Sequence, residues 1–468
     1  MCGHSWFRRK FDAPASKHVM TAAYRRYRCS PRGRVNRLSG EFLSKIATHR
    51  IWIVETGDPL PLLGRNVRLF RAAQIARRLT AGNASVVWWS AAFDHLQKRY
   101  IANGKSEVDL SPGMTARLLW GRRYTANVSL ARIVNHRQVA QRFRQWARRD
   151  PQRPGAIYCC YPTVDLALAA AEVGRERNVP VIIDIRDLWP EVFEEVSPLP
   201  RPLTRLALAP LYRQSRAALR GATGIWAITE PALEWGIELA ERTRGPHDRV
   251  VYHAYERPKI SGDGFAEAEH FWRLCGLKLD GSEKIGCWFG TLSETAEWSS
   301  LFEAVSLLPE PLRLSLRIVI GGSGPKFEEL QQMATGRAEI LVVGFLGQAQ
   351  ICALMQHAHF GLLHYPARKD LVRSVPTKVS EYFSAGLPII STLPGITEDL
   401  LAATGSGLRV ANRCAPALAK AMVELVTDEP KQAQMAANAR ALFEQRFNAD
   451  EVYGQAARDL IALARGAR

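Results

Sequence analysis

Short apolar runs alternate with stretches of helical periodicity along most of this chain, from residue 51 onward. Such runs are typical of buried strands, and apolar residues spaced by three and four indicate amphipathic helices. Strands separated by helix-length segments predict a parallel sheet with helices on both faces. The strands predicted in the first half are 51–54, 85–89, 156–160, 179–185, 224–228 and 249–252, and the first helix is 66–79.

The same alternation restarts after a polar stretch at 258–283. At 468 residues the chain is too long for one ordinary domain, so the two series fit two domains. We predict an α/β fold with two doubly wound, Rossmann-like parallel-sheet domains, at 48–256 and 257–448, which face a cleft. The strands predicted in the second half are 284–289, 315–320, 339–343, 359–363 and 388–391.

Positive charge is concentrated at the N-terminus. The formal net charge is +18, and residues 1–50 hold twelve Lys or Arg against Asp12 and Glu41, a local net of +10. Such an excess suits nucleic acid, anionic lipid or phosphorylated substrates, and a solvated basic surface is the plain alternative. Residues 1–47 are either a disordered basic extension or sequence upstream of a later start such as Met20.

A second basic stretch, 117–149, interleaves nine arginines with aromatic residues and contains no acidic residue. Arginine beside aromatic side chains suits an anionic membrane interface. Nucleic acid is not expected, because no recognition-helix, zinc or RNP pattern accompanies the stretch. No apolar run approaches the length of a membrane span or of a secretory signal, so we expect a cytoplasmic protein at the inner face of the plasma membrane.

Metal and redox motifs are missing from the sequence. It contains no Asp-x-Asp and no His-Glu-x-x-His, and its eight cysteines show no Cys-x-x-Cys spacing. We therefore expect no metal and no cofactor, and we interpret the cysteines as reduced thiols.

The most informative segment is 374–388, which predicts a helix opened by Ser374 and Pro376 and closed by Gly386. Lys378 and Glu381 lie three residues apart on one face, beside a helix N-terminus that attracts phosphate. A lysine for a diphosphate and a carboxylate for a ribose diol are what a nucleotide-sugar site needs. The alternative is an exposed charge pair.

Two glycine loops follow predicted strands at the same sheet edge, where doubly wound folds bind ligands. Gly290 and Thr291 follow one predicted strand, and Gly322, Ser323 and Gly324 follow the next. Their backbone N–H groups can approach phosphate, although a plain strand-to-helix turn would look alike. The second loop is not a dinucleotide fingerprint, because Phe327 stands where its third glycine would be.

In the first half, a long loop joins the first strand to the first helix and carries Gly64, Arg65, Asn66 and Arg68. Long loops at strand ends are often functional. Another strand ends in 184–191, where close carboxylates predict a general base or a hydroxyl-binding group, with a structural Arg–Asp pair as the alternative. The residues singled out there are Arg186, Asp187 and Glu191.

These motifs form a specific set when taken together. In the second half they are Phe289-Gly-Thr-Leu, Ile320-Gly-Gly-Ser-Gly-Pro, Val343-Gly-Phe-Leu-Gly347 and 374–388; in the first half they are 64–68, Asn127-Val-Ser, Asn135-His-Arg and 184–191. On them, residues 51–466 resemble a GT-B glycosyltransferase of family 4, the retaining group that builds bacterial surface polysaccharides.

The resemblance implies roles for individual residues. Glu381 matches the second glutamate of the family's Glu-x7-Glu motif, which hydrogen-bonds the donor ribose, and Lys378 matches a diphosphate clamp. Ser374, Pro376 and Thr377 join the glycine loops as donor-binding residues. The family's last helix crosses back to the first domain, a part that 449–468 would play.

The sequence also departs from the family. Arg373 stands at the first glutamate of Glu-x7-Glu, and 293–297 lacks the basic residue that many members carry. The catalytic-loop histidine of the acceptor domain has no match, and Arg186 or Asp187 lies in its place.

The function predicted from the sequence is retaining, metal-independent transfer of a sugar from a UDP- or GDP-sugar to a lipid-linked glycan acceptor at an anionic membrane surface. The alternatives are a GT-B sugar-nucleotide epimerase and a catalytically dead membrane-associated scaffold.

Overall fold

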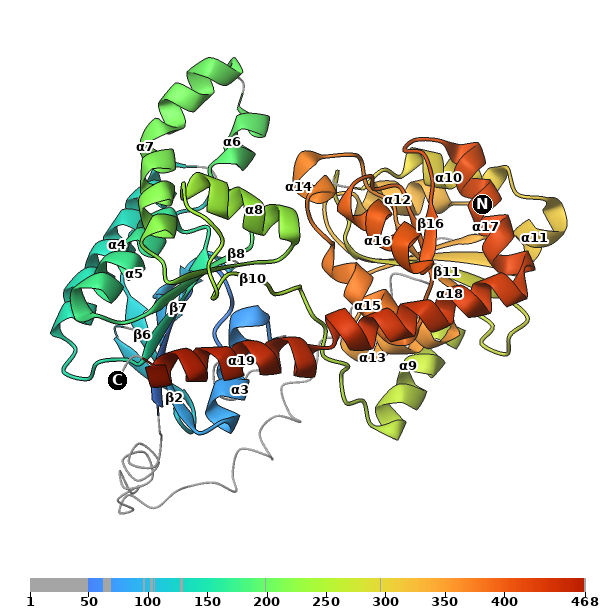
Figure 1. Cartoon of the computed structure of the whole chain (residues 1–468). Coiled ribbons are helices and arrows are strands. Elements are labelled where there is room, and N and C mark those ends of the chain that lie inside the picture. The colour runs from blue at the N-terminus through green and yellow to red at the C-terminus, as the bar shows by residue number, and fades with distance from the viewer. Residues whose placement is uncertain are drawn as a thin grey trace. The chain divides into compact units, whose positions relative to one another are not determined.

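The computed structural model describes residues 49–61, 69–95, 97–101, 104, 106–126, 129–197, 199–294 and 296–466. Within them the chain forms two large open sheets, and a two-stranded ribbon of β3 (Phe93–Asp94) and β4 (Arg99–Tyr100). Helices pack on both faces of each large sheet (Figure 1). The predicted α/β fold with two doubly wound sheets is confirmed.

The first sheet has the order β10-β9-β8-β7-β1-β2-β6-β5, and every neighbouring pair is parallel except β5 with β6. Its central strand β1 is apolar on both faces: Ile51 and Ile53 enter one core cluster, and Trp52 and Val54 enter the other. The strands are β1 (His49–Val54), β2 (Ala84–Ala91), β5 (Glu107–Ser111), β6 (Met114–Leu119), β7 (Ala156–Tyr161), β8 (Val181–Ile185), β9 (Gly224–Ala227) and β10 (Arg249–Val250).

The second sheet has the order β13-β12-β11-β14-β15-β16 and is parallel throughout. The strand order reverses between β11 and β14, which makes the carboxyl ends of these two strands the topological switch point. The strands are β11 (Lys284–Thr291), β12 (Leu316–Ser323), β13 (Ile340–Val343), β14 (Phe360–Leu363), β15 (Ile389–Ser391) and β16 (Gly407–Arg409).

All eleven predicted strands are present, and β5, β6 and β16 of the two large sheets and the ribbon strands β3 and β4 were not predicted. β5 and β6 form the edge of the first sheet, where the half-exposed face admits Glu107, Asp109 and Arg117, so their apolar runs are interrupted. β16 is three residues long. An edge position or a short length therefore hides a strand from the apolar pattern.

Helices cover the two faces of the first sheet with different core clusters. α4, α5, α7 and α8 contribute to one cluster, and α3 and α19 to the other. The predicted first helix begins at Arg71, and its expected start at 66–68 lies outside the described residues. These helices are α3 (Arg71–Ala81), α4 (Leu130–Arg149), α5 (Val164–Arg177), α6 (Glu191–Val196), α7 (Arg201–Arg220), α8 (Glu230–Leu239) and α19 (Ala449–Gly466).

Around the second sheet, α9 (Gly262–Leu274) packs on α13, and α10 packs on α17. A π-helical turn, η1 (Phe443–Phe447), follows α18 and leads towards α19. The other helices are α10 (Ser299–Ser306), α11 (Glu310–Ser315), α12 (Phe327–Ala334), α13 (Gln348–His357), α14 (Lys369–Val372), α15 (Thr377–Ala385), α16 (Ile396–Thr404), α17 (Ala415–Thr427) and α18 (Glu429–Leu442).

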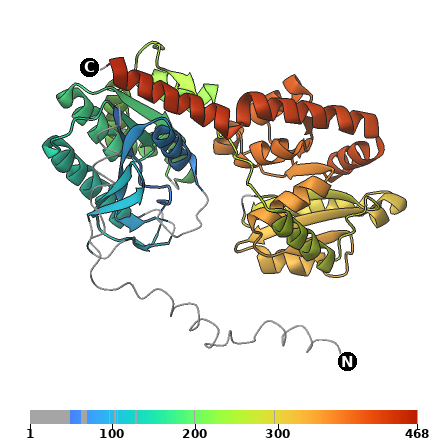
Figure 2. The same cartoon turned by 90° about the horizontal axis from the view of Figure 1, so that it is seen from below.

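The last helix, α19, follows the second sheet in sequence but packs on the first, against α3, β1 and β7 (Figure 2). Its buried residues Tyr453, Ala457 and Leu460 belong to the same core cluster as Ile51 of β1. The Tyr453 hydroxyl also accepts a hydrogen bond of 2.9 Å from the Ala254 backbone N–H. The two ends of the described chain therefore share one core.

The basic and aromatic stretch 117–149 forms the end of β6, a connection and α4. Phe143 is fully buried and packs edge-on against Trp52 and Trp89, and Tyr124 is also buried. These two rings are buried, so they cannot form part of the predicted aromatic interface, whereas Trp120 and Trp146 of the same stretch are half-buried. Several of the arginines pair with acidic residues from outside the stretch, as Arg144 does with Glu172 of α5 at 2.5 Å.

Candidate active site

The carboxyl ends of β11 and β14 bring together residues that are far apart in sequence. β11 ends at Gly290 and Thr291, and β14 is followed by His364 and Tyr365. α15 packs its buried face beneath these strands, with Tyr382 donating to the Cys287 carbonyl at 3.1 Å. The predicted donor-site helix therefore lies at the topological switch point of the second sheet.

Lys378 is held among aromatic rings and a glycine at this edge. Its Nζ donates a hydrogen bond to the Tyr365 hydroxyl and lies 4.3 Å from the centre of the Trp288 ring. A Cβ atom on Gly290 would come within 2.7 Å of that Nζ. The ammonium group thus lies against the end of β11, and the absence of a side chain at 290 leaves room for it.

Glu381 is only 5% exposed, so Lys378 and Glu381 are not the exposed charge pair left open as an alternative. Burial and the Glu381 carboxylate raise the pKa of Tyr365, which keeps the phenol protonated at neutral pH. Tyr365 therefore contacts the lysine directly and also responds to the charge of the glutamate. Sequence reasoning missed it, although its place directly after β14 was the available signal.

The start of α15 differs from the prediction. The helix begins at Thr377, and its N-cap residue is Pro376, two positions after Ser374. Pro376 has extended backbone angles, and the Ser374 carbonyl accepts a bond from Thr397 Oγ1 at 3.4 Å. Gly386 ends the helix in the left-handed conformation, as predicted.

The two glycine loops pack directly against each other. Gly290, Gly322 and Gly324 have φ angles of +148°, +150° and +152°, which side chains rarely allow. A Cβ atom on Gly322 would lie 1.8 Å from the Gly290 carbonyl oxygen, and the Leu292 N–H donates to the Ser323 carbonyl at 2.9 Å. The glycines therefore fix two strand ends in contact, whether or not phosphate binds there.

We expect Gly322→Ala to lower the free energy of unfolding by about 3 kcal/mol or more, because the added methyl group meets backbone at a strained φ. Urea unfolding followed by fluorescence measures the loss. Gly262→Ala, at the open start of α9, is the control, because no atom lies within 4 Å of its Cβ position. Equal stability of the two variants would contradict the packing role.

At the carboxyl edge of the first sheet, Arg186 lies in a buried network of charges. Its Nη1 lies 3.0 Å from Asp58, its Nε lies 3.3 Å from Asp184, and its Nη2 donates to the Cys160 sulfur at 3.0 Å. This is the structural Arg–Asp pairing that the sequence left open. Gly64, Arg65, Asn66 and Arg68 lie outside the described residues.

A second arginine, Arg71 of α3, completes this network. It pairs with Asp184 at 2.6 Å and donates to the carbonyls of Val251 and Tyr252. Burial alone would raise the pKa of Asp184, but Arg71 and Arg186 hold it below its usual value. Burial, Arg71 and Arg186 also lower the pKa of the nearby His253 to about 3, so its imidazole is neutral.

A small pocket of about 240 Å³ collects residues predicted from both halves of the sequence. Arg373 pairs with Glu191 at 3.0 Å, and its carbonyl accepts a bond from Thr229 Oγ1 at 3.1 Å. Arg373, which stands where the Glu-x7-Glu motif has its first glutamate, is therefore paired with Glu191, a predicted acceptor-binding residue. The site residues that line the pocket are Arg186, Asp187, Glu191, Ser374, Pro376 and Thr377, with His253 and Arg373 beside them.

Residues 276–442, most of the second half, match a family model described as glycosyl transferases group 1. The chain is a glycosyltransferase. No curated protein matches its sequence.

The glycosyltransferase has the GT-B fold of known structures with low sequence identity. HepE from Anabaena in complex with UDP is 15% identical, with a TM-score of 0.57 over 88% of this chain and 100% of that one. Sucrose-phosphate synthase from Thermosynechococcus elongatus is 17% identical, with a TM-score of 0.62 over 88% and 99%. WaaG, a glycosyltransferase involved in lipopolysaccharide biosynthesis, is 14% identical, with a TM-score of 0.55 over 88% and 99%.

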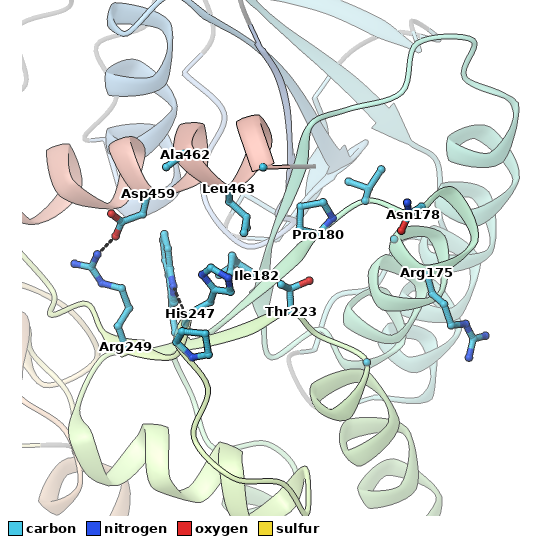
Figure 3. A pocket seen from close by; sticks show the side chains of 16 residues that line it. Arg175, Asn178, Pro180, Ile182, Thr223, His247, Arg249, Asp459, Ala462 and Leu463 are labelled. Atoms are coloured by element: carbon cyan, nitrogen blue, oxygen red, sulfur yellow. Dashed lines mark hydrogen bonds and ion pairs between the residues drawn. The ribbon is translucent and has the colours of Figure 1, made fainter. Parts of the chain in front are cut away.

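A larger hollow of about 1060 Å³ lies on the other edge of the first sheet, at the amino ends of its strands. Figure 3 shows Ile182, Thr223 and His247 around it, with Arg249 paired to Asp459 of α19. Ligands of doubly wound sheets bind at the carboxyl edge. None of the predicted site residues that the structure describes lines this hollow.

Among the residues that the structure describes, no helix is long and apolar enough to cross a membrane. The same part of the chain has no group of three His, Cys, Asp or Glu side chains that could hold a metal ion.

Proposed function

We propose that this glycosyltransferase is a retaining, metal-independent enzyme that transfers a sugar from a nucleotide diphosphate sugar to a lipid-linked glycan. UDP is favoured over GDP because the similar HepE binds UDP. The observation that carries the proposal is the arrangement of Lys378 against Gly290, with the buried Glu381 on the same helix. A cation and a carboxylate at the switch point suit a diphosphate and a ribose.

Lys378 would stabilise the leaving diphosphate. Negative charge develops on its oxygens as the bond from the sugar C1 breaks, and a preorganised ammonium lowers the free energy of that state. Trp288 and Tyr365 hold the ammonium in place, so little reorganisation is needed. We propose that Lys378 supplies this charge without a metal ion.

Retention would follow from attack on the same face of the sugar. The acceptor hydroxyl oxygen forms a bond to C1 while the C1–O bond to the diphosphate breaks, and the hydroxyl proton passes to a departing phosphate oxygen. Asp187 and Glu191 line the small pocket and could hold the acceptor hydroxyls. Arg186 would keep Asp58 and Asp184 in place, because its donors already bind them.

The lipid-linked acceptor and a role in bacterial surface polysaccharide synthesis rest on the resemblance of the motifs and on the likeness to WaaG. A soluble sugar phosphate is the competing acceptor, since the sucrose-phosphate synthase has the same fold. The proposal also places the enzyme at the inner face of the plasma membrane, where a lipid-linked acceptor would be found.

The test is a thermal-shift panel of UDP-, GDP- and dTDP-sugars, followed by nucleotide release with and without EDTA. We expect one class to raise the melting temperature, and we expect release to require an acceptor and to survive EDTA. Lipid extracts and soluble sugar phosphates are the two acceptor arms, and NMR of the product gives the anomeric configuration. No binding at all would favour a scaffold, and isomerised donor without an acceptor would favour an epimerase.

A further inference from the structure

The first half of α7 exposes an apolar stripe to solvent. Leu199, just before the helix, is 51% exposed, Leu203 is 54% exposed and Leu206 is 73% exposed. Pro210 continues the stripe and is also exposed. Within the helix, the spacings of three and four residues put Leu203, Leu206 and Pro210 on one face.

The second half of the same helix does enter the core. Ser215, Ala218 and Leu219 are buried, and the last two belong to the first-sheet core cluster. An amphipathic helix normally turns its apolar stripe inward, so a leucine stripe left outside marks an interaction surface.

Arginines surround this stripe. α7 contains five of them and no acidic residue. Arg213 is exposed and follows Pro210 by one turn. Two acidic residues pair with arginines of α7. Glu194 lies 3.0 Å from Arg205, and Glu241 pairs with Arg216 at 2.6 Å and with Arg220 at 2.8 Å. Long basic side chains beside exposed leucines suit anionic headgroups above an apolar layer.

Helix α7, which carries the stripe, is connected to the small pocket through α6. α6 begins at Glu191, which lines that pocket, and packs on α7 (Figure 1). The Tyr212 hydroxyl of α7 donates to Glu194 of α6 at 2.7 Å. A surface that held α7 would therefore lie near residues proposed to bind the acceptor.

The first turn of α4 adds two more exposed apolar residues, Leu130 at 81% and Ile133 at 47%. Arg132, between them, stacks 5.2 Å from the Trp189 ring, and Trp189 packs on Phe193 of α6. The helix that carries Leu130 and Ile133 is thus linked to α6 through Arg132 and Trp189.

We propose that the α7 stripe, Leu199, Leu203, Leu206 and Pro210, is a docking surface for an anionic lipid bilayer. The inference rests on the proposed lipid-linked acceptor, because docking through α7 would bring the small pocket to the lipid surface. The leucines would enter the interface while the arginines meet phosphate headgroups. A second copy fits less well, since a two-fold contact would set five arginines against five.

The test is co-sedimentation of the full chain with vesicles of phosphatidylcholine alone or mixed with phosphatidylglycerol. We expect binding to the mixed vesicles only, and we expect the double variant Leu203→Ser/Leu206→Ser to weaken it about tenfold or more. Leu307→Ser/Leu314→Ser is the matched control, because both residues are exposed leucines beside the second sheet. Arg213→Glu should weaken binding and make it less sensitive to salt.

Three outcomes would overturn the docking surface: no vesicle binding by the unchanged protein, equal loss in the control variant, or a dimer in light scattering that the α7 variant dissociates. Thermal shift with UDP is measured on the same samples and should be unaffected by the α7 changes. Vesicle binding without a UDP shift would contradict the proposed donor while leaving the surface intact. A UDP shift without vesicle binding would support the proposed donor and contradict the docking surface.

Discussion

Lys378→Met is expected to lower kcat/KM for the nucleotide sugar by about 10²–10³ while leaving the fold intact. Removing one preorganised donor from a developing oxyanion has effects of that size. Methionine keeps the aliphatic stem over the Trp288 ring, so the change removes the charge with little loss of packing. Nucleotide release at varied donor concentration measures the effect, and thermal unfolding confirms the fold.

Lys326→Met is the matched control for this prediction. Lys326 follows the neighbouring glycine loop, but its ammonium is paired with Glu294 at 2.8 Å and Glu329 at 2.6 Å. We expect its kcat/KM to change less than about threefold, as for an exposed ion pair. If both variants retained full turnover, the diphosphate would be held elsewhere and the role of Lys378 would be wrong.

Much of the donor edge could be predicted because the relevant signals are local. The helix that carries Lys378 and Glu381 ends at Gly386, and it is followed at once by the apolar strand β15. Apolar strands in a doubly wound order also imply which loops meet, so Gly290 and Gly322 were expected at one edge. The sequence pattern could not predict how the two loops pack against each other, because that packing depends on the register of β11 and β12.

The residues that sequence reasoning missed or misread depend on long-range contacts. Tyr365 gains its place only because β14 lies beside β11, and Arg186 meets Asp58 across 128 positions of sequence. The rings of 117–149 looked like an interface because their neighbours in the sequence are arginines. Their neighbours in space include Trp52 and Trp89, which makes Phe143 a core residue.

The buried charges at the first sheet connect the predicted acceptor edge to the chain segment that leads out of it. Arg71 binds Asp184 at the end of β8 and also binds the carbonyls of Val251 and Tyr252, which follow β10. Tyr158 donates to the other oxygen of Asp184 at 2.6 Å. One carboxylate therefore holds a strand end, a helix and a connection together.

Arg71→Leu is expected to lower the free energy of unfolding by about 3–5 kcal/mol at neutral pH, because it leaves the buried Asp184 without one of its partners. Both side chains are at most 2% exposed. Urea unfolding of the full chain measures the loss. Arg77→Leu on the same helix is the control, since its pair with Glu256 is exposed and should contribute less than about 1 kcal/mol.

The pH dependence of this loss has a definite sign. Asp184 has a lowered pKa in the folded protein, so its contribution to stability is present above the unfolded pKa and disappears as pH falls through the folded pKa. Removing Arg71 raises that folded pKa. The stability difference between the two proteins should therefore be largest at neutral pH and shrink in acid. A difference that stayed constant with pH would mean that Arg71 acts through packing and backbone contacts, and that its charge is unimportant.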